Sequence, residues 1–501
     1  MDQNNGGILG KINTPTTSVA SGVWSLDSQF EAQSSSIWPL AFPQTTIANS
    51  CRFDDGSSDF LSKTFGSAGN QQIMTISFWM KRSDLSGTKE VISQGSGSAC
   101  HINFQSSGTL EMNLRNSVDG GSNVFLITNR LFRDVSAWYH IVLALDTTQG
   151  TASNRAKLYV NGVQETSFGT ENYPGQNGNL FFNEASAMQI GEDTGGSNSN
   201  FDGYLTEFIF IDGQQLLPTS FGIFNTVSNV WEPRAYAGTY GTNGFRLDFA
   251  DSSALGNDVS GNDNDFTVNN LTSIDQSTDT CSNNFATWNP LVGSNAGGST
   301  VYYPTLEDGN TKATPGNAAQ NSIAVSTIGV SSGKWYAEFI LISESDSGAD
   351  SSIGVTDDLS AFQTENVQTS SQVLYSDSGS VHNRASSSSS GTSFSTGDVI
   401  GVALDLDNDN IYFSKNGTFI NSGAPTSGAT GTGAYSLGSG TNEYFFMVGD
   451  SRTGGSSVFR ANFGNPSASI SSGNADANGH GNFEYAVPSG YFALCTKNLA
   501  E

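Results

Sequence analysis

The sequence predicts an all-β protein in which two antiparallel β-sandwich (jelly-roll) domains in tandem follow an extended N-terminal arm. Short segments in which apolar and polar residues alternate recur along the chain, separated by turns rich in Gly, Asn, Asp and Ser. The 501 residues include 32 Phe and 15 Tyr, enough aromatic mass to fill sandwich cores. This length exceeds one ordinary core, and no heptads indicate a coiled-coil stalk.

The negative charge of the chain excludes several classes of partner. It carries 20 basic and 47 acidic residues, which gives a formal net charge of −27. Proteins that bind nucleic acids or anionic membranes concentrate Lys and Arg, and this sequence has no basic run. No window approaches the roughly 18 apolar residues of a membrane helix, and the start lacks the basic and apolar regions of a secretory signal. We therefore expect no nucleic acid, no membrane insertion and no signal peptide.

The four cysteines are widely scattered along the chain and form no CxxC pair, which argues against zinc binding. They are Cys51, Cys100, Cys281 and Cys495. We expect isolated buried thiols. A disulfide between Cys51 and Cys100, inside the first domain, is the alternative.

Residues 1–48 form the predicted arm. The segment contains the phrase GVWSL, with Trp24 and Leu26, and then Trp38 followed by Pro39. It is too short to fold alone, so its tryptophans are expected to bury into a neighbour. The alternative is a strand that packs on the first sandwich of the same chain.

Residues 49–222 are dense in predicted strands. Residues 73–80 and 138–146 alternate between apolar and polar positions, and residues 157–163 read as a hairpin. The Asn161-Gly162 pair in that hairpin supplies the positive φ angles of a tight turn. Together with FDGYLTEFIF at 201–210, these motifs resemble the laminin-G-like, concanavalin-type jelly roll. The resemblance covers nearly the whole segment.

Residues 223–300 are predicted to be a connector rich in Asn, Asp and Ser, and residues 301–501 the second sandwich. The second sandwich contains GKWYAEF at 333–339, GDVIGVALD at 397–405 and IYFSKNG at 411–417. These three phrases resemble the SPRY family, a β-sandwich that binds partners and performs no chemistry. The serine run at 386–390 is expected to be a loop.

Two further phrases suggest a source. GVWSL with the following Trp-Pro is similar to the N-terminal peptide of marine-bacteriophage virion proteins, and the connector resembles linkers of phage structural proteins. The resemblance implies a tail fibre or capsid appendage, anchored in the virion through Trp24, Leu26, Trp38 and Pro39. It further implies other virion proteins and a host surface polysaccharide or receptor as partners, a homo-oligomer with a trimer favoured, and synthesis in the host cytoplasm. A capsid-attached decoration protein of mainly structural role is the alternative.

Catalysis is not expected. Glucanases on jelly rolls present paired carboxylates on one strand, and the Glu-x-Asp-x-Glu pattern that would do so is absent. The nearest fragment is Glu344-Ser345-Asp346. A polysaccharide-degrading spike is therefore disfavoured, and no catalytic residue is assigned.

Binding residues can be proposed instead. Glycan sites combine aromatic faces with a few hydrogen-bonding groups, and the candidates in predicted loops are Tyr173, Phe201, Trp231, Tyr236 and Tyr240. No cofactor is required, but laminin-G-like domains often hold calcium between Asp side chains. The resemblance therefore implies a calcium site at Asp54, Asp55 and Asp202, with Asp59 and Asp193 nearby.

Overall fold

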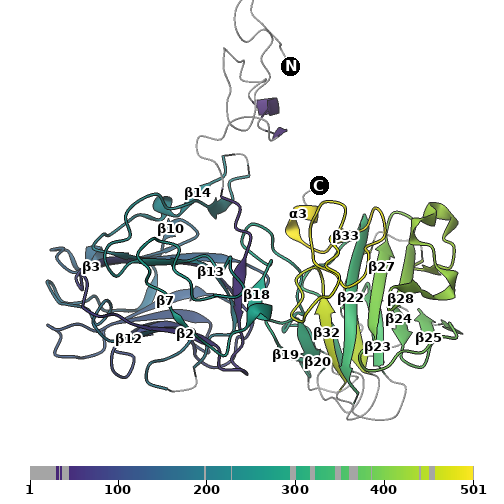
Figure 1. The fold of residues 1–501 in the computed structure, drawn as a ribbon, viewed down its shortest axis with the longest axis horizontal. Helices are drawn as coiled ribbons and strands as arrows, with labels where there is room; N and C mark the ends of the chain where they lie inside the picture. The colour runs from purple at the N-terminus through teal and green to yellow at the C-terminus, as the bar shows by residue number, and fades with distance from the viewer. Residues whose placement is uncertain are drawn as a thin grey trace, which may run out of the picture.

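The computed structural model describes residues 30–32, 34–35, 45–196, 199–226, 228–293, 301–315, 322–344, 351–359, 371–384, 386–438, 442–450 and 457–499. These residues build two β-sandwiches, one after the other along the chain (Figure 1), so the predicted all-β fold is confirmed. None of the helices in this part of the chain is long and apolar enough to cross a membrane. The predicted anchoring residues Trp24, Leu26, Trp38 and Pro39 lie outside the described residues.

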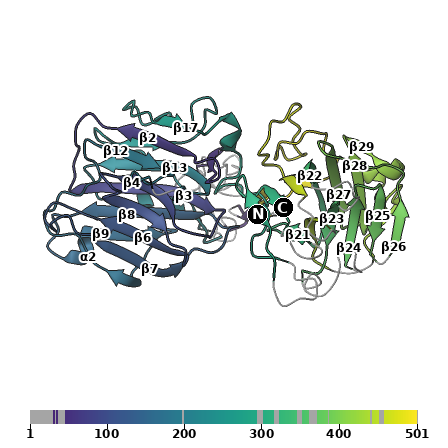
Figure 2. The same cartoon turned by 90° about the horizontal axis from the view of Figure 1, so that it is seen from below.

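The first sandwich packs two sheets face to face (Figures 1 and 2). The β3 sheet contains, in order, β10 (Val163–Gln164), β9 (Ala156–Val160), β8 (Tyr139–Asp146), β3 (Ile73–Arg82), β13 (Gly203–Asp212), β1 (Ser50–Phe53) and β18 (Gln276–Ser277), with β16 (Phe245–Leu247) paired to β13. The β5 sheet contains β11 (Phe168–Glu171), β7 (Phe125–Leu131), β6 (Thr109–Leu114), β5 (Cys100–Phe104), β4 (Lys89–Gln94), β12 (Ala187–Ile190), β2 (Phe60–Thr64) and β17 (Thr267–Asn269).

The alternation of strand β3 shows how sequence sets the two faces of its sheet. Met74, Ile76 and Phe78 point into the core and are fully buried. Ser77 and Trp79, which occupy alternate positions of the same strand, point away from the core, as the period of two requires. These outward residues are nevertheless buried, because a further layer covers them.

The predicted connector is part of the first sandwich over most of its length. Phe245–Leu247, Thr267–Asn269 and Gln276–Ser277 pair with β13, β2 and β1 respectively. Phe249 and Phe266 join the same core. The first sandwich therefore continues well beyond residue 222, the boundary that the sequence suggested.

The second sandwich also packs two sheets. The β22 sheet contains β19 (Thr305–Glu307), β20 (Lys312–Thr314), β32 (Val458–Asn462), β22 (Lys334–Ser343), β27 (Val399–Asp405), β28 (Asn410–Lys415) and β29 (Thr418–Phe419), with β30 (Tyr435–Ser436) paired to β28 and β33 (Phe492–Ala493) paired to β22. The β23 sheet contains β21 (Ser322–Val325), β31 (Phe445–Asp450), β23 (Ser351–Thr356), β24 (Gln372–Ser376), β25 (Ser380–Asn383) and β26 (Ser386–Ser389). Among the described strands, every pairing is antiparallel except that of β22 with β33. The serine run, expected to be a loop, supplies the exposed edge strand β26.

Each sandwich has one sheet whose outer face is covered by a later part of the chain. Over the β3 sheet lies the first cover, residues 216–240, which includes the ribbon of β14 (Gly222–Phe224) and β15 (Trp231–Pro233). Its Phe221 packs against Val142 and Ile209. Over the β22 sheet lies the second cover, residues 463–495, whose Phe483 and Tyr491 pack on outward residues of that sheet.

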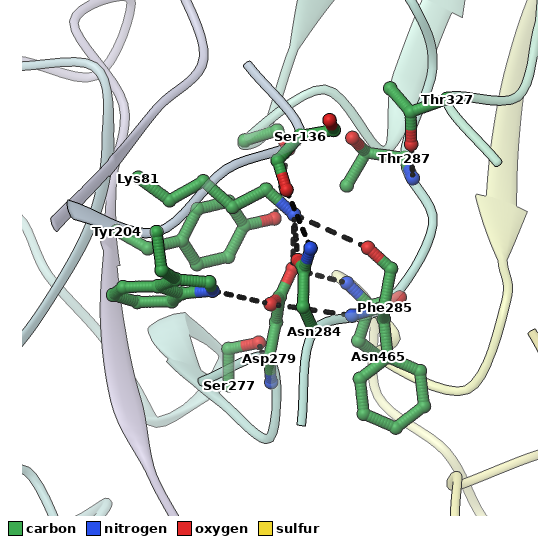
Figure 3. Close-up of polar contacts among 12 residues, drawn as sticks. Lys81, Ser136, Tyr204, Ser277, Asp279, Asn284, Phe285, Thr287, Thr327 and Asn465 are labelled. Atoms are coloured by element: carbon green, nitrogen blue, oxygen red, sulfur yellow. Dashed lines mark hydrogen bonds and ion pairs between the residues drawn. The ribbon is translucent and has the colours of Figure 1, made fainter. Parts of the chain in front are cut away.

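A buried polar junction joins the two sandwiches (Figure 3). Lys81, at the end of β3, places its Nζ 2.8 Å from Asp279 Oδ2 and donates to Asn284 Oδ1 at 2.8 Å. Both charged side chains are at most 1% exposed. From the second sandwich, Asn465 reaches the same carboxylate at 3.5 Å. A buried charge must be paired to be tolerated, so this pair fixes the chain between the domains.

Candidate functional site

A groove of about 480 Å³ lies where the β3 sheet meets the first cover. Its aromatic walls come from both parts of the chain: Trp79 and Trp138 from the sandwich, Phe224 and Trp231 from the cover. The hairpin turn after β9 contributes Asn161. We refer to this concavity as the first groove.

Two of the aromatic residues that line the first groove, Trp79 and Trp231, stack on the buried ring of His140. The ring of His140 lies 4.6 Å from that of Trp79 and 6.0 Å from that of Trp231, centroid to centroid, and all three are nearly parallel. Burial lowers the pKa of His140 to about 3, so the imidazole is neutral. Trp231 Nε1 donates to His140 Nδ1 at 3.0 Å, so the proton is on Nε2, which donates to Ser77 Oγ at 2.9 Å.

The indole of Trp231 is fixed by a close approach to the backbone of the hairpin turn. Asn161 and Gly162 have φ of 48° and 78°, as predicted for an Asn-Gly turn. A Cβ atom on Gly162 would lie 2.4 Å from Trp231 Cε3, so only glycine leaves room for the ring. The same turn therefore closes the hairpin and seats the cover.

The rim of the first groove is exposed and mixes apolar with polar groups. Val163, Phe224 and Val230 are 57%, 40% and 55% exposed. Beside them stand Asn229 and Arg130, whose Nε donates to Glu165 Oε2 at 2.7 Å. Aromatic and aliphatic faces next to amide and guanidinium donors suit a ring that has both C–H faces and hydroxyl groups.

The structure separates the five predicted glycan residues. Trp231 lines the first groove, but Tyr236 and Tyr240 pack with the first cover against the outer face of the β3 sheet. Tyr173 is half-buried against the core, and its hydroxyl donates to Glu171. Phe201 is fully buried in the core, which contradicts the prediction that its ring stacks on a sugar.

Some residues of the first groove that were not predicted could have been identified from the sequence. Trp79 lies in a strand whose alternation was recognised. That alternation places Trp79 on the outer face of the sheet, because its neighbour Phe78 faces the core. Trp138 directly precedes β8, the neighbouring strand of the same sheet. Neither the stacking on His140 nor the contribution of Phe224 has a local signature, because both depend on where the cover lies.

The predicted calcium residues do converge. Ligand oxygens of Asp54, Asp55 and Asp202 all lie within 4.8 Å of one another. Asp202 is buried, with 4% of its surface exposed. Burial and the neighbouring carboxylates hold the pKa of Asp202 well above its usual range.

One amine belongs to this acidic cluster. Lys89 Nζ pairs with Asp55 and lies 2.7 Å from Asp84 Oδ2. A single ammonium group faces four carboxylates, those of Asp54, Asp55, Asp84 and Asp202, so the cluster retains excess negative charge. Carboxylate oxygens are the ligands that calcium prefers, and the donor set fits that ion. Asp59 is not among the converging oxygens, although burial raises its pKa to about 6.

The four cysteines are free thiols, as expected. Three are buried, and Cys281 is half-buried at the edge of the first groove. The alternative disulfide between Cys51 and Cys100 is therefore absent.

Comparison with protein families identifies both sandwiches. Residues 55–214 match the Concanavalin A-like lectin/glucanases superfamily, and residues 334–435 match the SPRY domain. The chain therefore carries a concanavalin-like domain followed by an SPRY domain, and the two resemblances noted in the sequence are confirmed. Both covers, residues 216–240 and 463–495, lie outside the matched residues.

Solved structures match single portions of the chain. The SPRY domain of human HERC1 is 18% identical, covers 35% of this chain and 96% of its own, and has a TM-score of 0.25. A heptameric SAP-like pentraxin from Limulus polyphemus is 17% identical over 35% of this chain and 80% of its own, with a TM-score of 0.27. A Bacteroides ovatus protein named for carbohydrate binding is 16% identical over 46% and 60%, with a TM-score of 0.29. Among curated proteins none matches the chain.

Proposed function

We propose that this protein is a recognition protein without catalytic activity, which binds glycans through the first groove. The observation that carries the proposal is the groove itself. Its exposed residues Phe224 and Val230 lie beside the indole rings of Trp79 and Trp231 and the side chains of Asn161 and Asn229. An indole or phenyl face covers the C–H face of a sugar ring, while amides take its hydroxyl groups.

The biological setting we propose is the particle of a tailed phage, in which the chain is a fibre or appendage subunit. The support is the resemblance of the N-terminal phrases to virion proteins, with Trp24, Leu26, Trp38 and Pro39 as the anchor. Host surface polysaccharide is then the proposed ligand, and a homo-oligomer, favoured as a trimer, the proposed assembly. Weak single contacts repeated over one particle would give tight attachment through effective concentration.

A binding experiment on matched variants tests the groove. Phe224→Ala removes an exposed wall of the groove, and we expect affinity for host polysaccharide to fall about fivefold to tenfold. Leu217→Ala is the control, because Leu217 is 60% exposed in the same cover but does not line the groove. Equal binding by both variants would sink the proposed site. Release of reducing ends from the polysaccharide would contradict the absence of catalysis.

Imaging of labelled particles tests the setting. A tail fibre should copurify with tail proteins in low copy number, whereas a capsid-attached decoration protein, the competing placement, should follow the capsid protein in high copy number. Removal of residues 1–48 should abolish incorporation. Particles that incorporate the truncated chain normally would show that the anchor lies elsewhere.

A further inference from the structure

The second sandwich holds a pocket of about 460 Å³ at a position equivalent to that of the first groove. It lies where the β22 sheet meets the second cover, and its apolar lining includes Ile340 and Val399 from the sheet and Ile470 from the cover. We refer to it as the second pocket. The SPRY match ends at residue 435, so the residues of the second cover that close the pocket lie outside the matched domain.

The second pocket is framed by the same device as the first groove. Asn416 and Gly417 form a hairpin turn between β28 and β29, with φ of 48° and 79°. A Cβ atom on Gly417 would lie 2.5 Å from Cδ1 of Tyr485, so the tyrosine ring rests on this glycine as Trp231 rests on Gly162. Asn416 and Tyr485 both line the pocket.

A buried carboxylate holds the backbone of Glu484 and Tyr485 in place. Glu338, on the outward face of β22 and 2% exposed, accepts hydrogen bonds at 2.8 Å from the backbone N–H groups of Glu484 and Tyr485. The hydroxyl of Tyr336 donates to the same carboxylate at 3.1 Å. The cover is thus attached at the point where it forms the pocket wall, so the wall is in place before any ligand arrives.

The charges around the second pocket oppose an acidic ligand. Arg460 lines the pocket, but its Nη2 is paired with Asp308 Oδ2 at 2.8 Å. Glu484 also lines it and is solvent-exposed on its carboxylate, with hydrogen bonds from the backbone N–H and hydroxyl of Ser471 that lower its pKa. Because Asp308 already neutralises the guanidinium of Arg460, the carboxylate of Glu484 leaves the site negative, and a carboxylate or sulfate on the ligand would be repelled.

We infer that the second pocket is a second saccharide site, selective for sugar units that carry no acidic group. Tyr485, Ile340 and Ile470 would cover the C–H face of the ring, and the exposed carboxylate of Glu484 would accept its hydroxyl protons in charge-assisted hydrogen bonds. This inference rests on the proposed glycan-binding function and adds a second, independent site with its own selectivity.

Methyl NMR on the full chain distinguishes the two sites, because their aliphatic linings differ. Ile340, Ile470 and Val399 report the second pocket, whereas Val160, Val163 and Val230 report the first groove, which no isoleucine lines in the part of the chain that the structure describes. The probes are glucose, galactose, N-acetylglucosamine and glucuronic acid, each titrated to saturation. We expect at least one neutral sugar to shift the Ile340 and Ile470 methyls, and glucuronic acid to bind there at least about tenfold more weakly.

Two substitutions in the pocket sharpen the titration. Tyr485→Ala should weaken the neutral sugar about fivefold, while Tyr485→Phe, which keeps the ring, should bind it as the unaltered chain does. Glu484→Gln should weaken the neutral sugar and narrow the margin against glucuronic acid. Tyr303→Ala is the control, because Tyr303 is 54% exposed in the same half of the chain and lines neither site.

The outcomes separate this inference from the proposed function. Shifts of the groove valines without shifts of Ile340 and Ile470 would overturn the second site and leave the proposed function intact. Shifts of the isoleucines alone would support the second site and contradict the first groove. Glucuronic acid binding to the second pocket as tightly as the neutral sugars would overturn the selectivity.

Discussion

The two sandwiches have different relatives but complete their concave sites in the same way. In each, a later segment of the chain covers the outer face of one sheet, and an aromatic ring of that cover rests on the glycine of an Asn-Gly turn. The first groove is walled by indole and phenyl rings, whereas the second pocket has one tyrosine, the buried carboxylate of Glu338 and the more accessible carboxylate of Glu484. The comparison teaches that what each site can bind depends on the cover and not only on the family-matched strands.

Breaking the junction is expected to have the largest effect. Asp279→Ala leaves the buried ammonium of Lys81 without its carboxylate, and it also removes the acceptor of Trp138 Nε1. We expect a loss of about 3–5 kcal/mol in the free energy of unfolding, measured by urea denaturation. Asp251→Ala, at an exposed carboxylate, is the control and should change it by less than about 0.5 kcal/mol. A loss below 1 kcal/mol for Asp279→Ala would mean that the sandwiches do not depend on this pair.

Acid should destabilise the first sandwich through His140, which has no counterpart in the rings beneath the second cover. The pKa of His140 is lowered to about 3 in the folded state, whereas an unfolded histidine titrates near 6.5. Its contribution is complete above pH 6.5 and is lost as pH falls, by about 1.4 kcal/mol per pH unit, until the folded pKa is reached.

The measurement is the difference in unfolding free energy between the unaltered chain and His140→Gln at pH 7, 5.5 and 4.5. Gln can still donate to Ser77 and accept from Trp231, so the difference isolates the titration. Glu90 acts in the opposite direction, because burial raises its pKa to about 8 and its contribution is lost as pH rises above the unfolded value. Glu90 is present in both proteins, so its contribution cancels in the difference between their unfolding free energies. A pH-independent difference would exclude a neutral buried imidazole.

The two turn glycines provide a paired test of the covers. Gly162→Ala should cost about 3 kcal/mol, because the methyl group collides with an indole that is 7% exposed and cannot move away. Gly417→Ala should cost about 1 kcal/mol, mostly from the positive φ, because the half-buried ring of Tyr485 can shift. Thermal denaturation of both variants gives the ranking, and the reverse order would contradict the tighter seating of the first cover.

Calcium is expected to act on the first sandwich alone. In the described part of the chain, the converging carboxylates of Asp54, Asp55 and Asp202 are the only such group found, and all three belong to that sandwich. Calcium at ten times its dissociation constant should add about 1.4 kcal/mol to the unfolding free energy. Asp202→Asn should abolish this gain while stabilising the calcium-free protein, because a neutral amide is not repelled by the neighbouring carboxylates of Asp54 and Asp55. Identical unfolding free energies in calcium and in EDTA would show that no calcium binds and that the ammonium group of Lys89 alone compensates the carboxylates.

Local patterns predicted most of the strands, because a period of two and an Asn-Gly turn are written in consecutive residues. Both domain types came instead from the resemblance of longer phrases, such as FDGYLTEFIF and GKWYAEF, to known families. The connector was misjudged because strands of three residues, such as β16 and β17, are too short to show a period. Phe201 was misplaced because it follows a polar loop, although its ring enters the core beside Phe53. The groove could not be assembled from sequence, since Trp79 and Trp231 meet only through the path of the cover.

The Lys81–Asp279 pair has a consequence for attachment. If each sandwich holds a sugar, the buried junction around this ion pair, which Asn465 joins from the second sandwich, sets both the spacing and the angle at which the two sites are presented. A stiff spacer strengthens binding only when the epitopes on the target are spaced to match it, and it gains nothing on a surface where they are not. The protein would then select a glycan surface by the spacing of its sugar units as well as by their chemistry.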